Sequence, residues 1–325
     1  MLYRLSRSLF SILAVIGMSV AAAAPAYAAW PERTITLIVP FAAGGPGDVV
    51  GRLLAQALAQ KLSTNVIVEN RVGAVGNIGI TAASRAQADG YTLLATSNVI
   101  VINPSIKPVS YDPLKSFAPI AYLGASPNAI VTRPGSGITS IADLIAKAKA
   151  NPGKITYATT GVGSVSDLAV ELLKVRANIN MTHVPYSGAA PALQAAAAGT
   201  TDIASVSIGG VVGHIKSGLV KALVQTGSER WPDLPDVPTM KEAGIPNAVV
   251  ETWQMLLAPA GTPQPVIKKI ADAIHAIMQD PDVKTKMMKA GFRAGYTGPQ
   301  ELQARMQQEV PMWKEIVERA GIVKH

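Results

Sequence analysis

The chain uses one local pattern twice: a short strand rich in β-branched residues, a Gly-rich turn and an amphipathic helix. The first copy runs from a strand at 34–41 through the turn AAGGPGD into a helix over 49–62. The second runs from KITYAT through TGVGS into a helix that ends near Val175. Strands that alternate with helices predict parallel sheets whose binding loops lie at the carboxyl ends of the strands. Two such starts within 325 residues predict two α/β lobes.

The rest of the chain continues this alternation. A further Gly-rich turn at 73–77 opens a helix that ends near Gly90, and the segment 230–247 is rich in Pro and turns. We expect the last helix to break or kink at Pro311, because proline has no amide hydrogen to donate. Strands are expected at 65–70, 91–98, 181–186, 201–208 and 220–226, and helices at 141–153, 192–199, 212–215, 264–279, 281–290 and 299–320.

The first thirty residues are typical of a secretory signal peptide. Arg4 and Arg7 precede an apolar stretch over 9–24, and Ala26 and Ala28 supply the small residues that a signal peptidase recognises. The apolar stretch is too short for a comfortable membrane-spanning helix of about 20 residues, although a retained N-terminal anchor is the alternative. We therefore predict that residues 1–28 are removed and that the mature protein lies in the periplasm.

Composition and charge exclude several classes of protein. With 49% hydrophobic and 15% charged residues, the chain has enough apolar material for folded cores. The formal net charge is +8, but the basic residues are scattered singly, so we expect no nucleic-acid partner. The chain has no cysteine, which excludes disulfides, thiolate metal sites and a lipid anchor on cysteine. Its four histidines show no metal-ligand spacing, so neither a metal nor a cofactor is expected.

The first Gly-rich turn partly imitates a dinucleotide-binding fingerprint. Gly45, Gly47 and Gly51 follow a strand and open a helix, and Glu69 ends the next strand. A nucleotide-binding protein is therefore one alternative, but an exported chain rarely meets a soluble nicotinamide cofactor. An exported enzyme is the other alternative, although the sequence contains no GxSxG nucleophile motif.

Two aspartates near the Gly-rich turns have structural roles as their first interpretation. Ser164 and Asp167 form an S-x-x-D capping box, and Asp48 has the position of a cap or a first-turn acid. The turns themselves leave backbone amides unobstructed near helix N-termini, where the helix dipole favours anions. Two such turns on two lobes would hold one small carboxylate by main-chain hydrogen bonds and bridging water. The alternative is that the glycines only make tight bends.

A series of motifs resembles one known family along the whole mature chain. The motifs are, in order, PFAAGGPGDVVGRLLA, GNIG, ADGYTLL, NPGKITYATTGVGS, HVPYSGAAPALQ, DLPDVPTMKEAG and APAGTP. They closely resemble the extracytoplasmic receptors of tripartite tricarboxylate transporters, also called the Bug family. The resemblance implies a type II periplasmic binding protein whose two lobes are mostly parallel mixed sheets flanked by helices, with the ligand cleft between them.

The resemblance also implies a domain division and partners. The chain would cross between lobes near 128–133 and 252–259, so that lobe 1 holds residues 29–128 plus 254–325 and lobe 2 holds 129–253. It would capture a small organic carboxylate or a related amide without catalysis, as a monomer. It would then deliver this ligand to a transporter made of one large and one small membrane subunit.

In such receptors a carboxylate is held between two loops, one from each lobe, and these loops match 42–48 and 186–191. Further walls would come from the loop at 76–77, the strand end at 96–98, the turn at 160–167 and the strand end at 205–207. The predicted ligand-binding residues are Ala42, Gly44, Gly45, Asp48, Asn77, Thr96, Ser97, Thr160, Gly163, Ser164, Asp167, Tyr186, Ser187, Gly188, Ala189 and Ser207.

Two positions depart from the family's pattern. Ser187 stands where relatives often have a basic residue, and Asp167 lies near the place where they often have a histidine. Both departures argue against a strongly anionic distal group on the ligand. If Asp167 faces the cleft, it favours a ligand with an ammonium, amide or ring NH; if it only caps its helix, that preference disappears.

Overall fold

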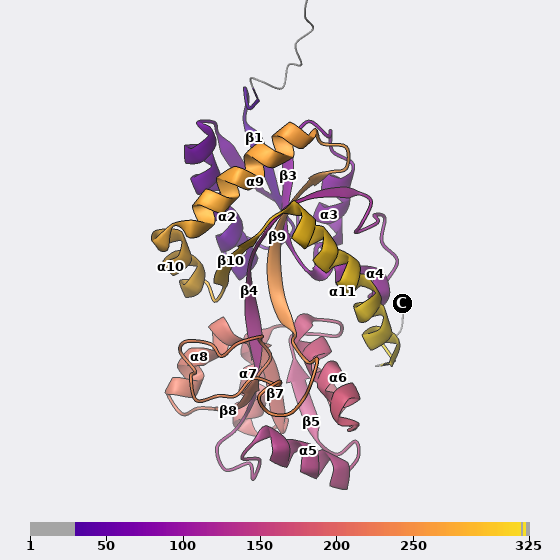
Figure 1. Ribbon diagram of the computed structural model, residues 1–325. Coiled ribbons are helices and arrows are strands. Elements are labelled where there is room, and N and C mark those ends of the chain that lie inside the picture. The colour runs from indigo at the N-terminus through magenta and orange to yellow at the C-terminus, as the bar shows by residue number, and fades with distance from the viewer. Residues whose placement is uncertain (1–29, 320, 323–325) are drawn as a thin grey trace, which may run out of the picture.

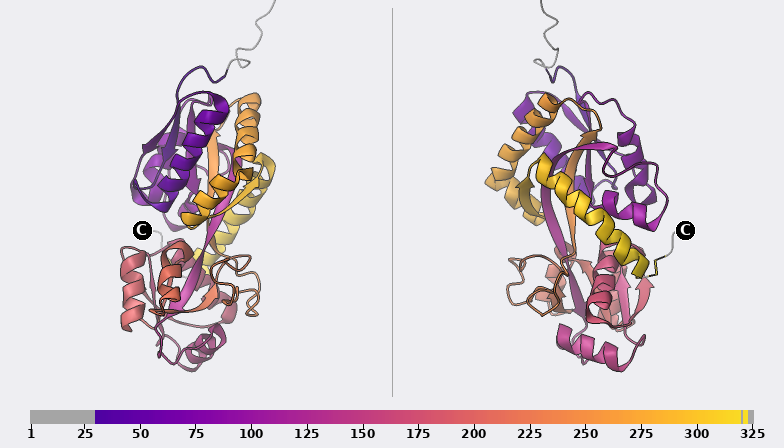
Figure 2. Two further views of the ribbon diagram at one scale, coloured as in Figure 1. Left: turned by 90° about the vertical axis from the view of Figure 1, so that its left-hand side faces the viewer. Right: turned by 45° about the vertical axis from the view of Figure 1, so that its right-hand side comes forward.

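The computed structural model describes residues 30–319 and 321–322, which fold into two α/β lobes (Figure 1). The predicted signal peptide, residues 1–28, lies outside the described residues. Lobe 1 is the upper lobe of Figure 1 and lobe 2 the lower one, and the two views of Figure 2 show the same separation. Along the described part of the chain, no helix combines the length and apolar character needed to cross a bilayer.

The sheet of lobe 1 places three parallel strands beside three antiparallel ones. Its order is β2-β1-β3-β9-β4-β10, in which β1, β2 and β3 run parallel and β9 pairs antiparallel with both β3 and β4. The strands are β1 (Ile35–Val39), β2 (Val66–Asn70), β3 (Thr92–Ser97), β4 (Phe117–Thr132), β9 (Glu251–Pro259) and β10 (Arg293–Thr297).

The sheet of lobe 2 follows the same plan and shares β4 with lobe 1. Its order is β8-β4-β7-β5-β6, in which β5, β6 and β7 run parallel and β4 is antiparallel to its neighbours. Its other strands are β5 (Thr156–Thr159), β6 (Thr182–Pro185), β7 (Ile203–Ser207) and β8 (Lys221–Gln225).

Helices cover both faces of each sheet (Figures 1 and 2). In lobe 1 they are α2 (Pro46–Leu62), η2 (Ala74–Gly76), α3 (Asn77–Ser84), α4 (Val99–Ile106), α9 (Gln264–Gln279), α10 (Pro281–Lys289) and α11 (Pro299–Arg319). In lobe 2 they are α5 (Ile141–Ala150), α6 (Val165–Ala177), α7 (Ala189–Ala198) and α8 (Ile208–Lys216).

Alternation along β1 shows why these strands are apolar throughout. Ile35, Leu37 and Val39 pack into the core under α2 and α9, whereas Ile38 packs into the core on the opposite face. Successive residues of a strand face opposite sides of the sheet, so a sheet covered by helices on both faces favours apolar residues at successive positions. This explains the largely apolar run ITLIV. The core opposite α2 continues from α4 and α11 of lobe 1 into α6 of lobe 2.

β4 changes its partners at the junction between the lobes. Residues up to Pro127 pair with β9, and from Asn128 onward the strand pairs with β7 and β8. The side chain of Thr226 accepts the amide of Asn128 at 2.8 Å and donates to the carbonyl of Val250. These bonds tie the two crossing segments to each other at the place where the chain leaves one sheet for the other.

Several elements differ from the sequence-based expectation or were absent from it. α4, β4, β9 and β10 were not expected, and α3 ends at Ser84 rather than near Gly90. α11 runs without interruption from Pro299 to Arg319, so the break expected at Pro311 does not occur. α7 begins at Ala189, three residues earlier than predicted, so its first turn includes part of the expected loop. β4 was not predicted as a long strand, because Pro119, Gly124 and Pro127 are residues that usually end strands.

Gly124 offers a test of the packing of β10 against β4. Its φ is +142°, and an added Cβ would lie 2.3 Å from the carbonyl oxygen of Arg293 in β10. We expect Gly124→Ala to lower the free energy of unfolding by roughly 1–3 kcal/mol, because backbone must move. Gly210→Ala is the control, since its Cβ would meet nothing within 4 Å in α8. Equal urea midpoints for the two variants would contradict this account.

Candidate functional site

The carboxyl ends of the parallel strands in both lobes point at the junction. β3 ends at Ser97, and the next amide, that of Asn98, donates to the carbonyl of Trp253 where β9 leaves the junction. β7 ends at Ser207, which pairs with Asn128, the first β4 residue in the sheet of lobe 2. Because β1 and β2 run parallel to β3, and β5 and β6 to β7, the loops that follow all six strands lie toward the other lobe (Figure 1).

The first turn of lobe 1 presents backbone and little else. Ala42 and Gly44 are exposed, and Gly44 has a φ of +78°, which glycine adopts without strain. Gly45 is the N-cap of α2, and no side chain caps this helix end. Since the first amides of a helix lack intrahelical acceptors, the N-terminus of α2 keeps donors available beside this turn.

Asp48 fixes this turn from beneath. Its carboxylate is buried and accepts hydrogen bonds from the amide of Gly44 at 2.8 Å, from Arg52 at 2.8 Å and from Asn70 at 2.7 Å. Burial alone would raise the pKa of Asp48, but the bonds from Arg52, Asn70 and Gly44 outweigh it and hold the pKa below its usual value. Asp48 therefore acts on the turn from inside lobe 1.

The second loop of lobe 1 has a constrained backbone. Gly73, Ala74, Val75 and Gly76 all have positive φ, which is rare for a β-branched residue such as Val75. Side chains from α4 and the segment after it hold the loop: Asn103 donates to the Val75 carbonyl and Lys107 to the Ala74 carbonyl, both at 3.0 Å.

Asn77 and the end of β3 face inward. The carboxamide oxygen of Asn77 accepts from Asn103 at 2.8 Å and from the Tyr111 hydroxyl at 3.0 Å. Thr96 and Ser97 are buried in β3, and the hydroxyl of Thr96 has no hydrogen-bond partner among the described residues. The side chains of these predicted wall residues of lobe 1 thus lie within the lobe and help to hold its loops in place.

The Gly-rich turn of lobe 2 is capped as the sequence predicted. The Ser164 hydroxyl accepts the amide of Asp167 at 3.2 Å, and the Asp167 carboxylate accepts the amide of Gly163 at 2.9 Å. Thr160 joins the same turn: its amide donates to the hydroxyl of Ser166, and the two hydroxyls lie 2.8 Å apart. Asp167 is 1% exposed, so its carboxylate faces the interior of lobe 2.

A buried polar network lies beneath this turn, and sequence analysis did not anticipate it. His183 Nδ1 lies 3.5 Å from Asp167, its Nε2 lies 2.6 Å from the Thr159 hydroxyl, and its ring stacks on Tyr157. The Tyr157 hydroxyl donates to Glu171. Burial raises the pKa of Asp167, and the bond from Gly163 offsets this only in part; burial also lowers the pKa of His183.

The loop after β6 completes the lobe 2 side. The amide of Tyr186 donates to the carbonyl of Thr159 at 3.1 Å, which sets this loop beside the Gly-rich turn. Ser187 is exposed, and Gly188 is the N-cap of α7 with no side-chain cap, so Ala189 lies in the first turn of the helix. At the end of β7, the Ser207 hydroxyl lies 3.2 Å from that of Ser126.

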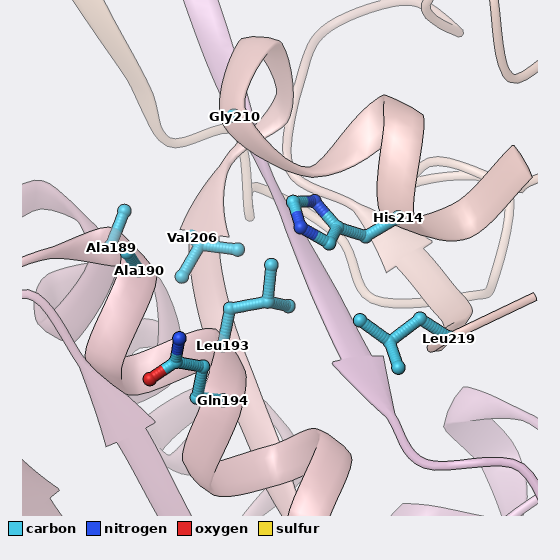
Figure 3. Close-up of a pocket in the computed structure, with 8 residues that line it drawn as sticks. All are labelled: Ala189, Ala190, Leu193, Gln194, Val206, Gly210, His214 and Leu219. Atoms are coloured by element: carbon cyan, nitrogen blue, oxygen red, sulfur yellow. The ribbon is translucent and has the colours of Figure 1, made fainter. Parts of the chain in front are cut away.

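The structure brings the predicted residues together within each lobe but does not join the two principal loops. Within the described chain, no hydrogen bond or ion pair links the 42–48 turn to residues 186–191. A cavity of about 240 Å³ lies between α7 and α8 of lobe 2, with Ala189 and Leu193 on one wall and His214 on another (Figure 3). Glu69, the acid of the dinucleotide-like pattern, pairs on the surface with Arg71 at 2.6 Å.

No group of three or more acidic or histidine side chains that could hold a metal ion occurs in residues 30–319 and 321–322. The donors gathered at the junction are mostly backbone amides and neutral hydroxyls. Such a set can bind an anion by directed hydrogen bonds.

Comparison with protein families identifies the family of this chain. A model described as the tripartite tricarboxylate transporter family receptor matches residues 50–322. The chain belongs to this receptor family. Receptors of this family are solute-binding proteins of the periplasm. Protein BugT from Bordetella pertussis strain Tohama I is 34% identical over 317 residues, which cover 95% of this chain and 97% of BugT.

Two solved structures of similar proteins hold ligands. MatC from Rhodopseudomonas palustris, with bound malate, has a TM-score of 0.71 at 33% identity and is covered over 100% of its length by 89% of this chain. Rpa4515 of R. palustris, with adipate, has a TM-score of 0.77 at 30% identity, with coverage of 91% of this chain and 100% of that one. The predicted family and two-lobed α/β fold are therefore confirmed.

Asp48 and Asp167 allow a matched test, because both are third residues of a helix and both accept an amide four residues earlier. The lowered pKa of Asp48 means that its charge stabilises the fold at neutral pH, and this contribution is lost as the pH falls below about 3.9. We expect Asp48→Asn to cost about 2 kcal/mol at pH 7 and progressively less in acid.

Asp167→Asn should show the opposite pH dependence. Because the pKa of Asp167 is raised, wild-type protein loses stability as the pH rises from about 3.9 through the raised value, whereas the asparagine variant does not. Urea unfolding of wild type and both variants between pH 3 and 7 gives the two differences directly. Slopes of the same sign would show that the two aspartates do not lie in the contrasting environments described.

Proposed function

We propose that this protein is a periplasmic receptor that captures a small organic carboxylate between its lobes and delivers it to a membrane transporter. The observation that carries the proposal is the pair of uncapped helix N-termini at Gly45 and Gly188. One belongs to each lobe, and both follow carboxyl ends of parallel strands at the junction. Their amides and helix dipoles suit one carboxylate, the group shared by malate and adipate in the solved relatives.

The proposed cleft is bounded by the predicted ligand-binding residues of both lobes. We assign residues 29–128 plus 254–325 to lobe 1 and 129–253 to lobe 2, supported by the change of β4 partners between Pro127 and Asn128. In this assignment Asp48 and Asp167 hold the loops in place from inside the lobes, and the ligand contacts the backbone above them.

Capture proceeds by closure of the lobes. The 42–48 turn and the 186–191 loop have no direct bond, so a ligand that contacts both stabilises the arrangement in which they are close. The family's name implies a tripartite transporter, and we propose that its membrane subunits recognise the closed form. Delivery in the periplasm requires export, which we assign to a signal peptide over residues 1–28 that is then cleaved. No step in this cycle requires a cofactor or a covalent intermediate.

A panel of organic acids in a thermal-shift assay tests the proposed function. A ligand at about 100 times its dissociation constant should add about 2.7 kcal/mol of stability, which corresponds to a rise of roughly 5–10 °C. Each stabilising compound is then incubated with the protein and its concentration followed. Turnover of such a compound would favour an exported enzyme, and the absence of any shift across carboxylates and amides would refute the receptor function.

Gly188→Val tests the position of the grip. An added Cβ at Gly188 meets nothing within 4 Å, and its φ of 162° is extended backbone that valine also adopts, so we expect an unchanged melting temperature. The added side chain should block approach to the amides of α7 and abolish binding of any acid found in the panel. Gly213→Val, also in open space but within α8, is the control. Unchanged affinity in Gly188→Val would place the carboxylate elsewhere.

A further inference from the structure

The loop after β8 also ends at the junction, and its Glu229 and Arg230 pair with Arg293 and Glu242. The loop segments that follow the six parallel strands named above carry no charged side chain. None of these segments contains Lys, Arg, His, Asp or Glu: 40–47, 72–78, 96–99, 160–166, 186–191 and 207–210. Of the charges that flank them, Asp48 and Asp167 are buried and Arg71 pairs with Glu69. Backbone amides at α2 and α7 can satisfy one carboxylate, whereas a second would lose its hydration with no cationic side chain on these loops.

Lobe 1 instead presents an apolar side chain. Val75 is 60% exposed at the tip of the loop after β2, in a left-handed conformation with φ +55°. Asn103 donates to the carbonyl of Val75 itself, and Lys107 donates to the carbonyl of the preceding residue, Ala74. A β-branched residue in this conformation is strained, so the contacts of α4 keep Val75 outward at some cost.

Lobe 2 presents a second exposed valine, in the Gly-rich turn after β5. Val162 is 62% exposed between Gly161 and Gly163, at the tip of the turn after β5. Exposed tips of Gly-rich turns usually carry polar residues, because exposing the apolar side chain of valine to water is unfavourable.

Consecutive residues at the end of α4 bring these two loops into one neighbourhood. Lys107 donates to the carbonyl of Ala74 in the Val75 loop. Its neighbour Ile106 touches the Val162 turn, because a Cβ on Gly163 would lie 2.6 Å from Ile106 Cδ1. The two exposed valines therefore flank the same end of α4, one on each side of the junction.

We propose that the cleft selects a monocarboxylate with an apolar body. The uncapped amides of α2 and α7 hold its single carboxylate, and Val75 and Val162 contact its hydrocarbon or aromatic part. The Lys107 ammonium donates to the carbonyl of Ala74 and thereby positions the loop. Asp167 would favour a ligand with a distal ammonium or amide only if its side chain faced the cleft. Because Asp167 is buried in lobe 2, that preference does not arise. This inference rests on the proposed function, since it assigns the chemistry of the same cleft.

Matched acids test the inference by isothermal titration calorimetry on the mature protein. Hexanoate is compared with adipate and benzoate with terephthalate, so that each pair differs by one carboxylate. We expect the monoacid of a pair to bind at least about tenfold tighter than its diacid, equivalent to about 1.4 kcal/mol. Val75→Ser and Val162→Ser should each weaken monoacid binding roughly tenfold through lost apolar contact and change diacid binding little.

Val249→Ser is the matched control, because Val249 is 42% exposed and lies outside these loops. A diacid that binds as tightly as its monoacid would overturn the apolar selection while leaving a carboxylate receptor in place. If the two serine variants weakened the binding of monoacid and diacid equally, the proposal would also be overturned. The valines would then act through contact between the lobes and not through contact with the apolar part of the ligand. Failure of every carboxylate in the calorimeter and the thermal-shift panel would overturn the proposed function itself.

Discussion

The backbone pairing of β4 is the constraint on which both lobes depend. Its 16 residues lie between β9 and β10 in one sheet and between β7 and β8 in the other. The side chain of Asn98 donates to the carbonyl of Glu251 at 2.9 Å, and Thr226 bonds both crossing segments. Because one strand runs through both sheets, the carboxyl ends of the parallel strands of each lobe are directed at the other. The site is thus a consequence of topology before any side chain is considered.

The two Gly-rich turns show how one local device is placed in two different environments. In each, an aspartate at the third helical position accepts the amide that precedes the N-cap, which orients the turn from below. Arg52 neutralises Asp48, whereas Asp167 shares its surroundings with Glu171, Tyr157 and His183. Both turns are anchored from below by buried side chains, which leaves backbone amides on their outer surfaces. A binding surface made of fixed amides loses little conformational freedom when a ligand arrives.

Features set by local periodicity were predictable, and features set by distant contacts were not. The strand, turn and helix units follow from the spacing of apolar residues, and α9 has the bounds that its pattern predicts. β4 was missed because its prolines and Gly124 usually interrupt strands, and here a shared central position overrides that preference. The motifs predict which loops line the cleft. They could not decide where Asp167 points, because Asp167 lies in α6 and its partner His183 in β6, which only the folded sheet brings together.

The distribution of charge explains how such a receptor can be both selective and reversible. A buried ion pair with the ligand would require both charges to be stripped of water, and release would have to restore that hydration. In the site proposed here, amides at two helix ends would bind a carboxylate without a counter-charge that needs desolvation, and the neutral loops around them would add shape and apolar contact. With one helix end on each lobe, such a site would reach its full set of donors only when both lobes contact the ligand. Binding and closure would then be coupled, as the proposed recognition of the closed form by a membrane partner requires.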